Sequence, residues 1–216
     1  MAIEREIKLT LPPAQAEAAV RFFTSRMASA GQIMRLNNIY FDTPELALSQ
    51  AKSALRLRRT PDGWLQTLKT TGVMQDGLHA RHEWEMPVPG EALDLERLLR
   101  ACGDTAIASV LRAAAPALVA LFRTDFTRTV WTWQTNQADI EIALDQGEIV
   151  ARADSNVRGD IRGNMRRAPI SEIELELKRG AADALHALVA QLIAHIPGLA
   201  RDDVSKAQRG YELRAR

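Results

Sequence analysis

The chain has 216 residues, of which 46% are hydrophobic, a composition that can form a substantial core. With 28 lysines and arginines against 27 aspartates and glutamates, its net charge of +1 excludes a whole-molecule attraction to nucleic acid or anionic membranes. No apolar run reaches the ~20 residues that a membrane span needs, and the N-terminus lacks the apolar core of a signal peptide. Cys102 is the single cysteine of the sequence, so a reducing, cytoplasmic location without an internal disulfide is expected.

Strand and helix periods alternate along the chain and predict one α+β domain over residues 1–216, with a core over about 1–211 and a tail over 212–216. Residues 2–10 alternate like a strand. Pro12-Pro13 then begins a helix over 13–30, which Gly31 would end. Short alternating segments separated by turn residues follow and predict an antiparallel meander over 35–41, 53–59, 64–70 and 79–87.

The second half of the chain begins with an Ala- and Leu-rich segment, 91–121, that predicts two short helices. Further strands are expected over 123–134, 138–145 and 170–179. A helix over 181–196 follows, and the segment from Ser205 onward is expected to be a short helix or irregular. Residues 153–168, rich in Arg, Gly, Asp and Asn, are predicted to form the most mobile loop.

The predicted strands carry charge on one face. In Glu4-x-Glu6-x-Lys8 the ionisable side chains share a face, and Ile7 and Leu9 lie on the other, because successive strand side chains point to opposite sides. The same alternation gives later strands a charged face through Arg56 and Arg58, Arg81, Glu83 and Glu85, Glu141 and Asp145, and Glu172, Glu174, Glu176 and Lys178.

Two arrangements fit these charged faces. A two-layer domain could expose each face to solvent. However, the stripes are mostly Glu and Arg rather than the Thr, Ser, Gln and Lys of surface strands. If the sheet closes with its apolar side against helices, the charged face lines a lumen. A lumen with both signs of charge suits a metal-chelated polyphosphate, because carboxylates bind hard divalent cations while Arg and Lys neutralise phosphate oxygens.

Several motifs stand in order along the chain: Glu4-x-Glu6-x-Lys8, Tyr40-Phe41-Asp42-Thr43-Pro44, Leu55-Arg56-Leu57-Arg58, Thr67-Leu68-Lys69, Arg81-x-Glu83-x-Glu85, Glu141 to Asp145-x-Gly147, Ile173-Glu174-Leu175-Glu176-Leu177 and Ser205-Lys206-x-x-Arg209-Gly210-Tyr211. With this set the chain resembles the CYTH superfamily, or triphosphate tunnel metalloenzymes, over essentially its whole length. It looks most like the bacterial inorganic triphosphatase branch. Members of that branch often continue into a helical CHAD domain, so a longer form of the chain could carry one as a partner.

The resemblance implies a closed tunnel of eight antiparallel strands with helices packed outside. It also implies hydrolysis of tripolyphosphate to diphosphate and phosphate with Mg²⁺ or Mn²⁺, with two ions expected. The implied metal ligands are Glu4, Glu6, Glu85, Asp145, Glu174 and Glu176, with Glu83 and Glu141 as further acidic candidates. The implied phosphate ligands are Arg56, Arg58, Lys69, Arg81, Arg128, Lys206 and Arg209. Lys8 would act in catalysis together with Glu4 and Glu6.

Some residues keep alternative roles. Lys8 suits a general base or a cation that orients phosphate or water, and its carboxylate neighbours favour the cation because they stabilise the charged form. Glu172 could be solvated or a ligand, and Asp42 could be only an Asx-turn residue. His79 and His82 are expected on opposite strand faces, so they are not expected to share a metal.

The function also keeps alternatives. An adenylyl cyclase or a thiamine or nucleoside triphosphatase would use the same fold, with specificity set at the tunnel mouth. A non-catalytic polyphosphate-binding module is the third hypothesis. The acidic residues disfavour it, since carboxylates repel a polyanion unless a metal is bound.

Overall fold

A computed structural model of the chain describes residues 2–70, 72–75, 77–152 and 165–215, and the statements below concern these residues. Its long strands are β1 (Ala2–Thr10), β2 (Gln32–Asp42), β3 (Ser53–Thr60), β4 (Gly63–Thr70), β6 (Leu78–Val88), β7 (Val119–Gln134), β8 (Ala138–Arg152) and β9 (Met165–Gly180). The short strand β5 (Val73–Gln75) pairs with β6, and β10 (Ala200–Arg201) pairs with β1. The helices are α1 (Ala16–Met27), α2 (Ala47–Gln50), α3 (Leu95–Ala101), α4 (Thr105–Ala114), α5 (Ala182–His195) and α6 (Lys206–Ala215), with 3₁₀ turns at Pro13–Gln15 and Ala115–Ala117.

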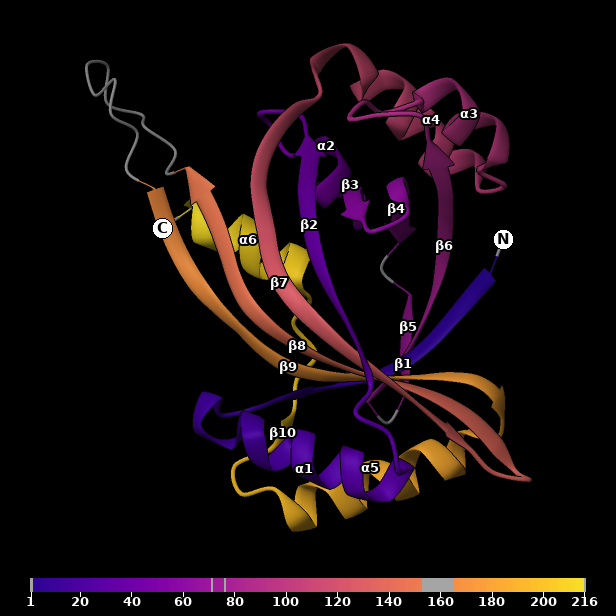
Figure 1. The fold of residues 1–216 in the computed structure, drawn as a ribbon. Helices are drawn as coiled ribbons and strands as arrows, with labels where there is room; N and C mark the ends of the chain where they lie inside the picture. The colour runs from indigo at the N-terminus through magenta and orange to yellow at the C-terminus, as the bar shows by residue number, and fades with distance from the viewer. Residues whose placement is uncertain (1, 71, 76, 153–164, 216) are drawn as a thin grey trace.

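The sheet closes on itself (Figure 1). Its long strands pair in the order β1-β9-β8-β7-β2-β3-β4-β6, and β6 returns to pair with β1 through Glu4↔Arg81 and Glu6↔His79. All of these pairings are antiparallel. The prediction of a closed eight-stranded antiparallel barrel with helices outside is therefore confirmed.

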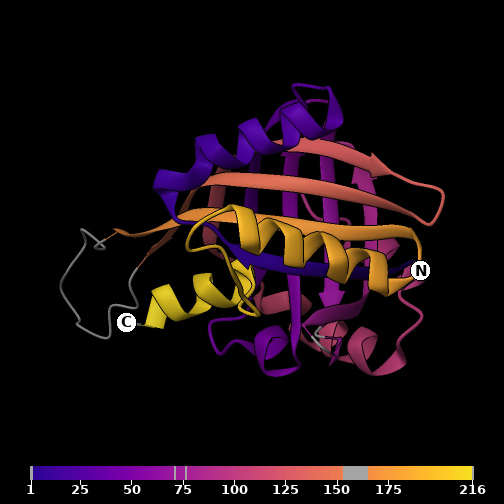
Figure 2. The same ribbon diagram turned by 90° about the horizontal axis from the view of Figure 1, so that it is seen from below.

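The apolar faces of the strands point outward, against helices. Ile7 and Leu9 of β1 are fully buried in a cluster with α1 and α5, which lie next to each other on one outer side of the barrel (Figures 1 and 2). Leu55 of β3 and Leu68 of β4 are buried on another side, in a cluster with α3 and α4. Strand alternation then turns the charged faces inward, as the lumen interpretation requires.

Helix α6 packs on the inner face of the barrel at one end. Leu213 of α6 belongs to a buried cluster with Phe122 and Phe126, which share a strand face with Arg128. Gly210 lies so close to Phe122 that a Cβ there would be 2.2 Å from the ring, so only glycine fits at this crossing. The C-terminal helix therefore narrows this mouth of the tunnel.

Several boundaries differ from the sequence predictions, among them the end of β8 at Arg152 rather than at 145, and three of the differences concern a helix end, the predicted loop and the predicted tail. Helix α1 ends at Met27 rather than at Ala30, because Ala28 takes a left-handed conformation and donates its N–H to Thr24. Strand β9 already begins at Met165, so residues 165–168 are not a loop; the rest of that prediction, 153–164, lies outside the described residues. The predicted tail begins inside helix α6, which continues to Ala215 with Leu213 buried.

A membrane-spanning role finds no support among the helices. None of those in the described ranges is both long and apolar enough to cross a bilayer.

Candidate active site

The barrel encloses a cavity of about 970 Å³. All of the predicted site residues line this cavity except Asp145 and Arg209; Asp145 contacts the lining residues Arg128 and Lys206, and Arg209 contacts Glu172. Residues far apart in the chain thus meet in one charged tunnel. Among the described residues, three groups of charged side chains lie in or beside the tunnel: an ion-paired acidic cluster, a row of acidic residues with too few cations to neutralise it, and a set of cations.

The first wall of the tunnel carries Glu4, which is held by two cations. Glu4 accepts hydrogen bonds from Lys69 Nζ at 2.9 and 3.0 Å and from Arg81 Nε at 2.9 Å. Arg81 also contacts Glu6, and Lys69 also pairs with Glu83 at 3.0 Å. Burial would raise the pKa of Glu4, but Lys69 and Arg81 outweigh burial and hold this pKa well below its usual range. Glu4 is therefore ionised at neutral pH.

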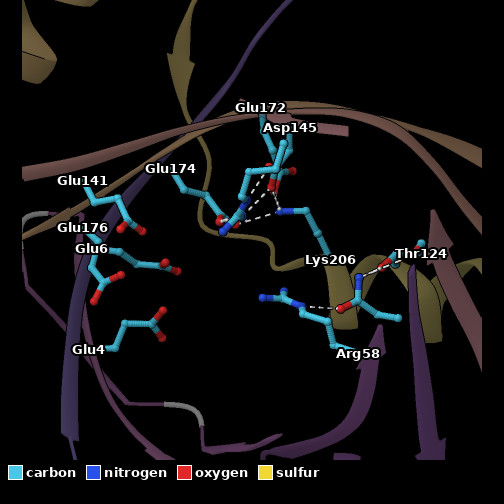
Figure 3. A network of polar contacts seen from close by, with 12 residues as sticks. Glu4, Glu6, Arg58, Thr124, Glu141, Asp145, Glu172, Glu174, Glu176 and Lys206 are labelled. Carbon is cyan, nitrogen blue, oxygen red and sulfur yellow. Dashed lines mark hydrogen bonds and ion pairs between the residues drawn. The ribbon is translucent and has the colours of Figure 1, made fainter. Parts of the chain in front are cut away.

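Three carboxylates lie side by side on neighbouring strands next to Glu4. Glu6 is directly opposite Glu176 in the β1–β9 register, and Glu176 is directly opposite Glu141 in the β8–β9 register. We call Glu6, Glu176 and Glu141 the acid row. Figure 3 shows them, with Glu4, pointing into the tunnel from one side. Like charges directly opposite one another destabilise a sheet, so this row calls for a cation.

The side chains around the acid row compensate it only in part. Lys178 pairs with Glu176 at 2.6 Å and with Glu141 at 3.7 Å, and Arg81 is shared between Glu6 and Glu4. Burial, followed by the nearby charge of Glu174, raises the pKa of Glu6 to about 7. Burial also raises the pKa of Glu176, although Lys178 opposes this. Oxygen ligands that carry excess negative charge suit a hard divalent cation, so the donor set fits Mg²⁺ or Mn²⁺.

A second acidic cluster contains Asp145, Glu172 and Glu174, whose carboxylate oxygens lie within 4.8 Å of one another. This spacing could hold a metal ion, yet the cluster already carries its own cations. Arg128 donates to Asp145 at 2.7 and 2.6 Å, and Lys206 pairs with Asp145 at 2.6 Å and with Glu174 at 2.8 Å.

The remaining member of this cluster, Glu172, contacts both Lys206 and Arg209. Glu172 is 1% exposed, so its solvated alternative is wrong. Burial would raise the pKa of Glu174, but Lys206 and Arg128 hold it well below its usual value. The three carboxylates of this cluster are therefore paired with three cations, Arg128, Lys206 and Arg209, and we expect a metal at the acid row rather than at this cluster. The predicted ligand Glu85 is likewise ion-paired, with Arg56 at 3.3 Å.

Arg58 is a half-buried cation without a counter-ion. Among the described residues, no carboxylate lies within ion-pair distance of it; its Nε donates to Asn38 Oδ1 at 2.7 Å instead. Asn38 is itself held by a hydrogen bond to Thr124 Oγ1 at 2.9 Å. Burial, followed by the charges of Arg56 and Arg128, lowers the pKa of Arg58 to about 9. An uncompensated guanidinium in a tunnel is a site for an anion such as a phosphate group.

Sequence reasoning missed two residues that shape this site, Asn38 and Asp202. Asn38 carries no charge, so charge patterning passed over it, although it stands on the same strand face as Tyr40. Lys8 lines the cavity as predicted, but its charged partner is Asp202, with 3.2 Å between Nζ and Oδ2. Asp42 has a structural role, but its Asx-turn alternative is wrong, because the residue two positions on is Pro44, which has no N–H: Asp42 accepts instead from the N–H groups of Thr43, Leu48 and Ser49, and also from the Tyr211 hydroxyl.

Comparison with known proteins places this barrel in a family. A family model for the CYTH domain matches residues 2–211, and the chain therefore belongs to the CYTH domain family. The chain is 31% identical over 210 residues to the inorganic triphosphatase of Haemophilus influenzae, covering 97% of this chain and 54% of that protein. It thus spans about half the length of this curated relative.

Solved structures show the same fold. A putative adenylyl cyclase from Hippeastrum, described as having a dominant triphosphatase activity, superposes with a TM-score of 0.64 at 17% identity, covering 97% of this chain and 95% of that chain. A putative adenylate cyclase from Bacillus halodurans gives a TM-score of 0.55 at 20% identity, covering 97% and 98%. At these identities the likeness concerns the fold, and the chemistry has to be argued from the tunnel itself.

Proposed function

We propose that the protein is a metal-dependent inorganic triphosphatase that hydrolyses tripolyphosphate to diphosphate and phosphate inside the tunnel. The observation that carries the proposal is the presence, in one cavity, of the under-compensated acid row and the counter-ion-free Arg58. A ligand with both signs of charge, a divalent cation on a polyphosphate, would compensate both. Membership of the CYTH family and the similarity to an inorganic triphosphatase support this assignment.

The metal-binding residues would be Glu6 and Glu176, with Glu141, Glu4 and Glu174 around them. We propose Mg²⁺ or Mn²⁺, with two ions as the expected number. When bound, such ions supply Lewis-acid stabilisation of phosphate oxygens and lower the pKa of a bound water. The Arg81 and Lys69 contacts hold Glu4 ionised, whereas the raised pKa values of Glu6 and Glu176 mean that a bound cation would favour their ionised forms.

The cations would bind and orient the phosphate chain. Arg58, held by Asn38, presents its guanidinium to the cavity, and Arg56 lies on the same face of β3. Lys69, Arg81, Arg128 and Lys206 are engaged with carboxylates and would exchange these for phosphate oxygens. Phosphoryl transfer needs little more from a protein than such positioning and charge stabilisation. We assign Lys8 the role of orienting a phosphate oxygen or water.

A second candidate function rests on the mouth opposite α6. A cavity of about 610 Å³ there is lined by Met34, Leu65, Pro87 and Val130 and reaches Arg58. An organic group attached to a triphosphate would find apolar contacts at this mouth, so a nucleoside or thiamine triphosphatase is the alternative. Adenylyl cyclase activity and non-catalytic binding remain further hypotheses, and a CHAD domain and a cytoplasmic location stay predictions.

One panel tests these assignments. Phosphate release from tripolyphosphate, ATP and thiamine triphosphate, together with cyclic AMP formation, is measured with Mg²⁺, Mn²⁺ or chelator. Metal-dependent release from tripolyphosphate that far exceeds release from ATP and thiamine triphosphate is expected. A preference for an organic triphosphate would move the assignment to the second candidate, and cyclic AMP would indicate a cyclase. Tight binding without turnover would indicate a binding module.

A further inference from the structure

We propose that Asp202 is a positioning residue that holds the Lys8 ammonium group at the tunnel wall and away from the carboxylates beside it. The inference rests on the proposed function. Lys8 is 4% exposed, and Asp202 Oδ2 lies 3.2 Å from its Nζ. Among the described residues, this is the one carboxylate within ion-pair distance of Lys8, and no well-aligned hydrogen-bond acceptor faces Nζ.

The arrangement is unexpected from the strand register alone. Lys8 is directly opposite Glu174 in the β1–β9 pairing and two residues from Glu6 on the same strand face. A lysine in that place would be expected to pair with either carboxylate. Doing so would neutralise side chains that the proposed metal needs. The Lys8 ammonium group instead pairs with Asp202, so Glu6 contacts Arg81, and Glu174 contacts Arg128 and Lys206.

Asp202 is itself fixed at three points, so it can act as an anchor. Its N–H donates to the Lys8 carbonyl oxygen at 3.0 Å, and β10 immediately before it pairs with β1 through Leu9↔Arg201. Its Oδ1 accepts from the Val204 N–H at 2.9 Å, which leaves Oδ2 for Lys8. The carboxylate therefore cannot rotate to follow a moving lysine without losing the Val204 contact.

The anchor leaves Lys8 available to a ligand. An ammonium group has three N–H donors, and Asp202 occupies one direction only. Lys8 also lines the main cavity, and its buried Nζ has no well-aligned acceptor among the described residues, so its remaining donors are unsatisfied. We infer that Asp202 fixes the point from which Lys8 reaches a phosphate oxygen or water, and that losing it costs turnover more than substrate affinity.

The neighbouring residue offers a matched control. Asp203 carries the same charge and also lines the main cavity, but its carboxylate pairs with His79 Nε2 at 3.3 Å and is 52% exposed. Asp203→Asn therefore removes the same charge from the adjacent position without touching Lys8. A general electrostatic or folding effect of losing an acid in this segment would appear in both variants, whereas the proposed positioning effect would appear only in Asp202→Asn.

The kinetic experiment compares Asp202→Asn, Asp203→Asn, Lys8→Met and the Lys8→Met/Asp202→Asn double variant in metal-dependent tripolyphosphate hydrolysis. Misplacing a reacting or orienting group costs about 10- to 100-fold in rate. We expect Asp202→Asn to lower kcat by about this factor with KM changed less than about threefold, and Asp203→Asn to lower kcat by a clearly smaller factor. The double variant should match Lys8→Met, because Asp202 acts through Lys8.

Two results would overturn the inference: equal kcat for Asp202→Asn and Asp203→Asn, or a further loss of kcat in the double variant. Melting temperatures show whether each variant is folded. If Asp202→Asn does not fold, Asp202→Glu keeps the charge but moves the carboxylate by one methylene. Unchanged kcat in that variant would also contradict the positioning role.

A readout independent of activity separates the inference from the proposed function. In ¹⁵N-lysine NMR spectra, the Lys8 ammonium signal is identified by its absence from Lys8→Met. We expect it to persist in Asp203→Asn and to shift or exchange away in Asp202→Asn. If wild type releases no phosphate, the proposed function is wrong, and the NMR comparison still decides whether Asp202 holds Lys8. If wild type is active but neither kcat nor the signal depends on Asp202, the inference alone is wrong.

Discussion

Glu6 gives the sharpest quantitative prediction, because its carboxyl group is buried beside other acids. Its pKa is raised to about 7, against an ordinary value of 4.5. A carboxyl group whose pKa is higher in the folded state favours folding at low pH, and this advantage is lost as pH rises through 4.5 toward 7. Applying linkage to these two values, the metal-free protein loses on the order of 2–3 kcal/mol of stability from Glu6 between pH 5 and pH 8.

The variant Glu6→Gln cannot ionise, so it should not lose this stability. Urea denaturation in the presence of a chelator at pH 5 and pH 8 measures the effect for wild type, Glu6→Gln and Glu17→Gln. Glu17 is 89% exposed and serves as the surface control. The difference in unfolding free energy between Glu6→Gln and wild type should shift by roughly 2–3 kcal/mol in favour of the variant from pH 5 to pH 8. A difference that is flat with pH, or that shifts the other way, would refute the account of the acid row.

Three further predictions follow from single contacts. Arg58→Met should leave the melting temperature unchanged or raised, because it removes a half-buried charge that has no carboxylate partner, and it should lower kcat/KM for tripolyphosphate by about 100-fold or more. Arg21→Met, at a 72% exposed side chain, is the matched control, and an equal loss of kcat/KM in both variants would contradict the phosphate-binding role of Arg58. Asp42→Ala removes the acceptor of several buried hydrogen bonds and should cost about 3–5 kcal/mol in urea denaturation, whereas a cost below about 1 kcal/mol would show that α2 does not depend on it. Gly210→Ala places a methyl group against the Phe122 ring and should displace α6, detected as a lower melting temperature and faster amide exchange in α6; unchanged exchange would show that the crossing can relax.

Strand alternation made the barrel predictable, because it is a local property of the sequence. Ile7 and Leu9 on one face and Glu6 and Lys8 on the other specify which side meets the helices. The choice between an exposed charged face and a lumen needed one further step, the observation that the stripes are mostly Glu and Arg rather than the mixed polar residues of surface strands. The structure shows the lumen in the pairing of β6 with β1, which closes the barrel around the charged faces.

Partner identities inside the tunnel were not predictable from the sequence. Lys206 and Glu172 are 34 residues apart and meet only because α6 folds back against the inner face of the barrel. The pairing of Lys8 with Asp202 depends in the same way on the antiparallel pairing of β10 with β1. Local patterns specify which residues point inward, whereas tertiary packing decides which of them neutralise each other.

The end of α1 shows the same limit on a smaller scale. Gly31 has a positive φ and is a good helix terminator by sequence, yet the helix ends at Met27. Gly31 instead packs against Trp131, whose indole N–H donates to the Ser29 carbonyl at 3.0 Å. The glycine is needed for this close contact with β7, which cannot be read from the helix sequence alone.

The central claim is that the tunnel is a metal-dependent triphosphatase that depends on its acidic wall. Its most direct test measures phosphate release from tripolyphosphate by wild type, the Glu4→Gln/Glu6→Gln double variant and Glu17→Gln. Wild type and Glu17→Gln should release phosphate with Mg²⁺ or Mn²⁺ and not with chelator, while the double variant should lose about 100-fold or more. Release that persists in chelator, or that survives undiminished in the double variant with metal present, would contradict the claim.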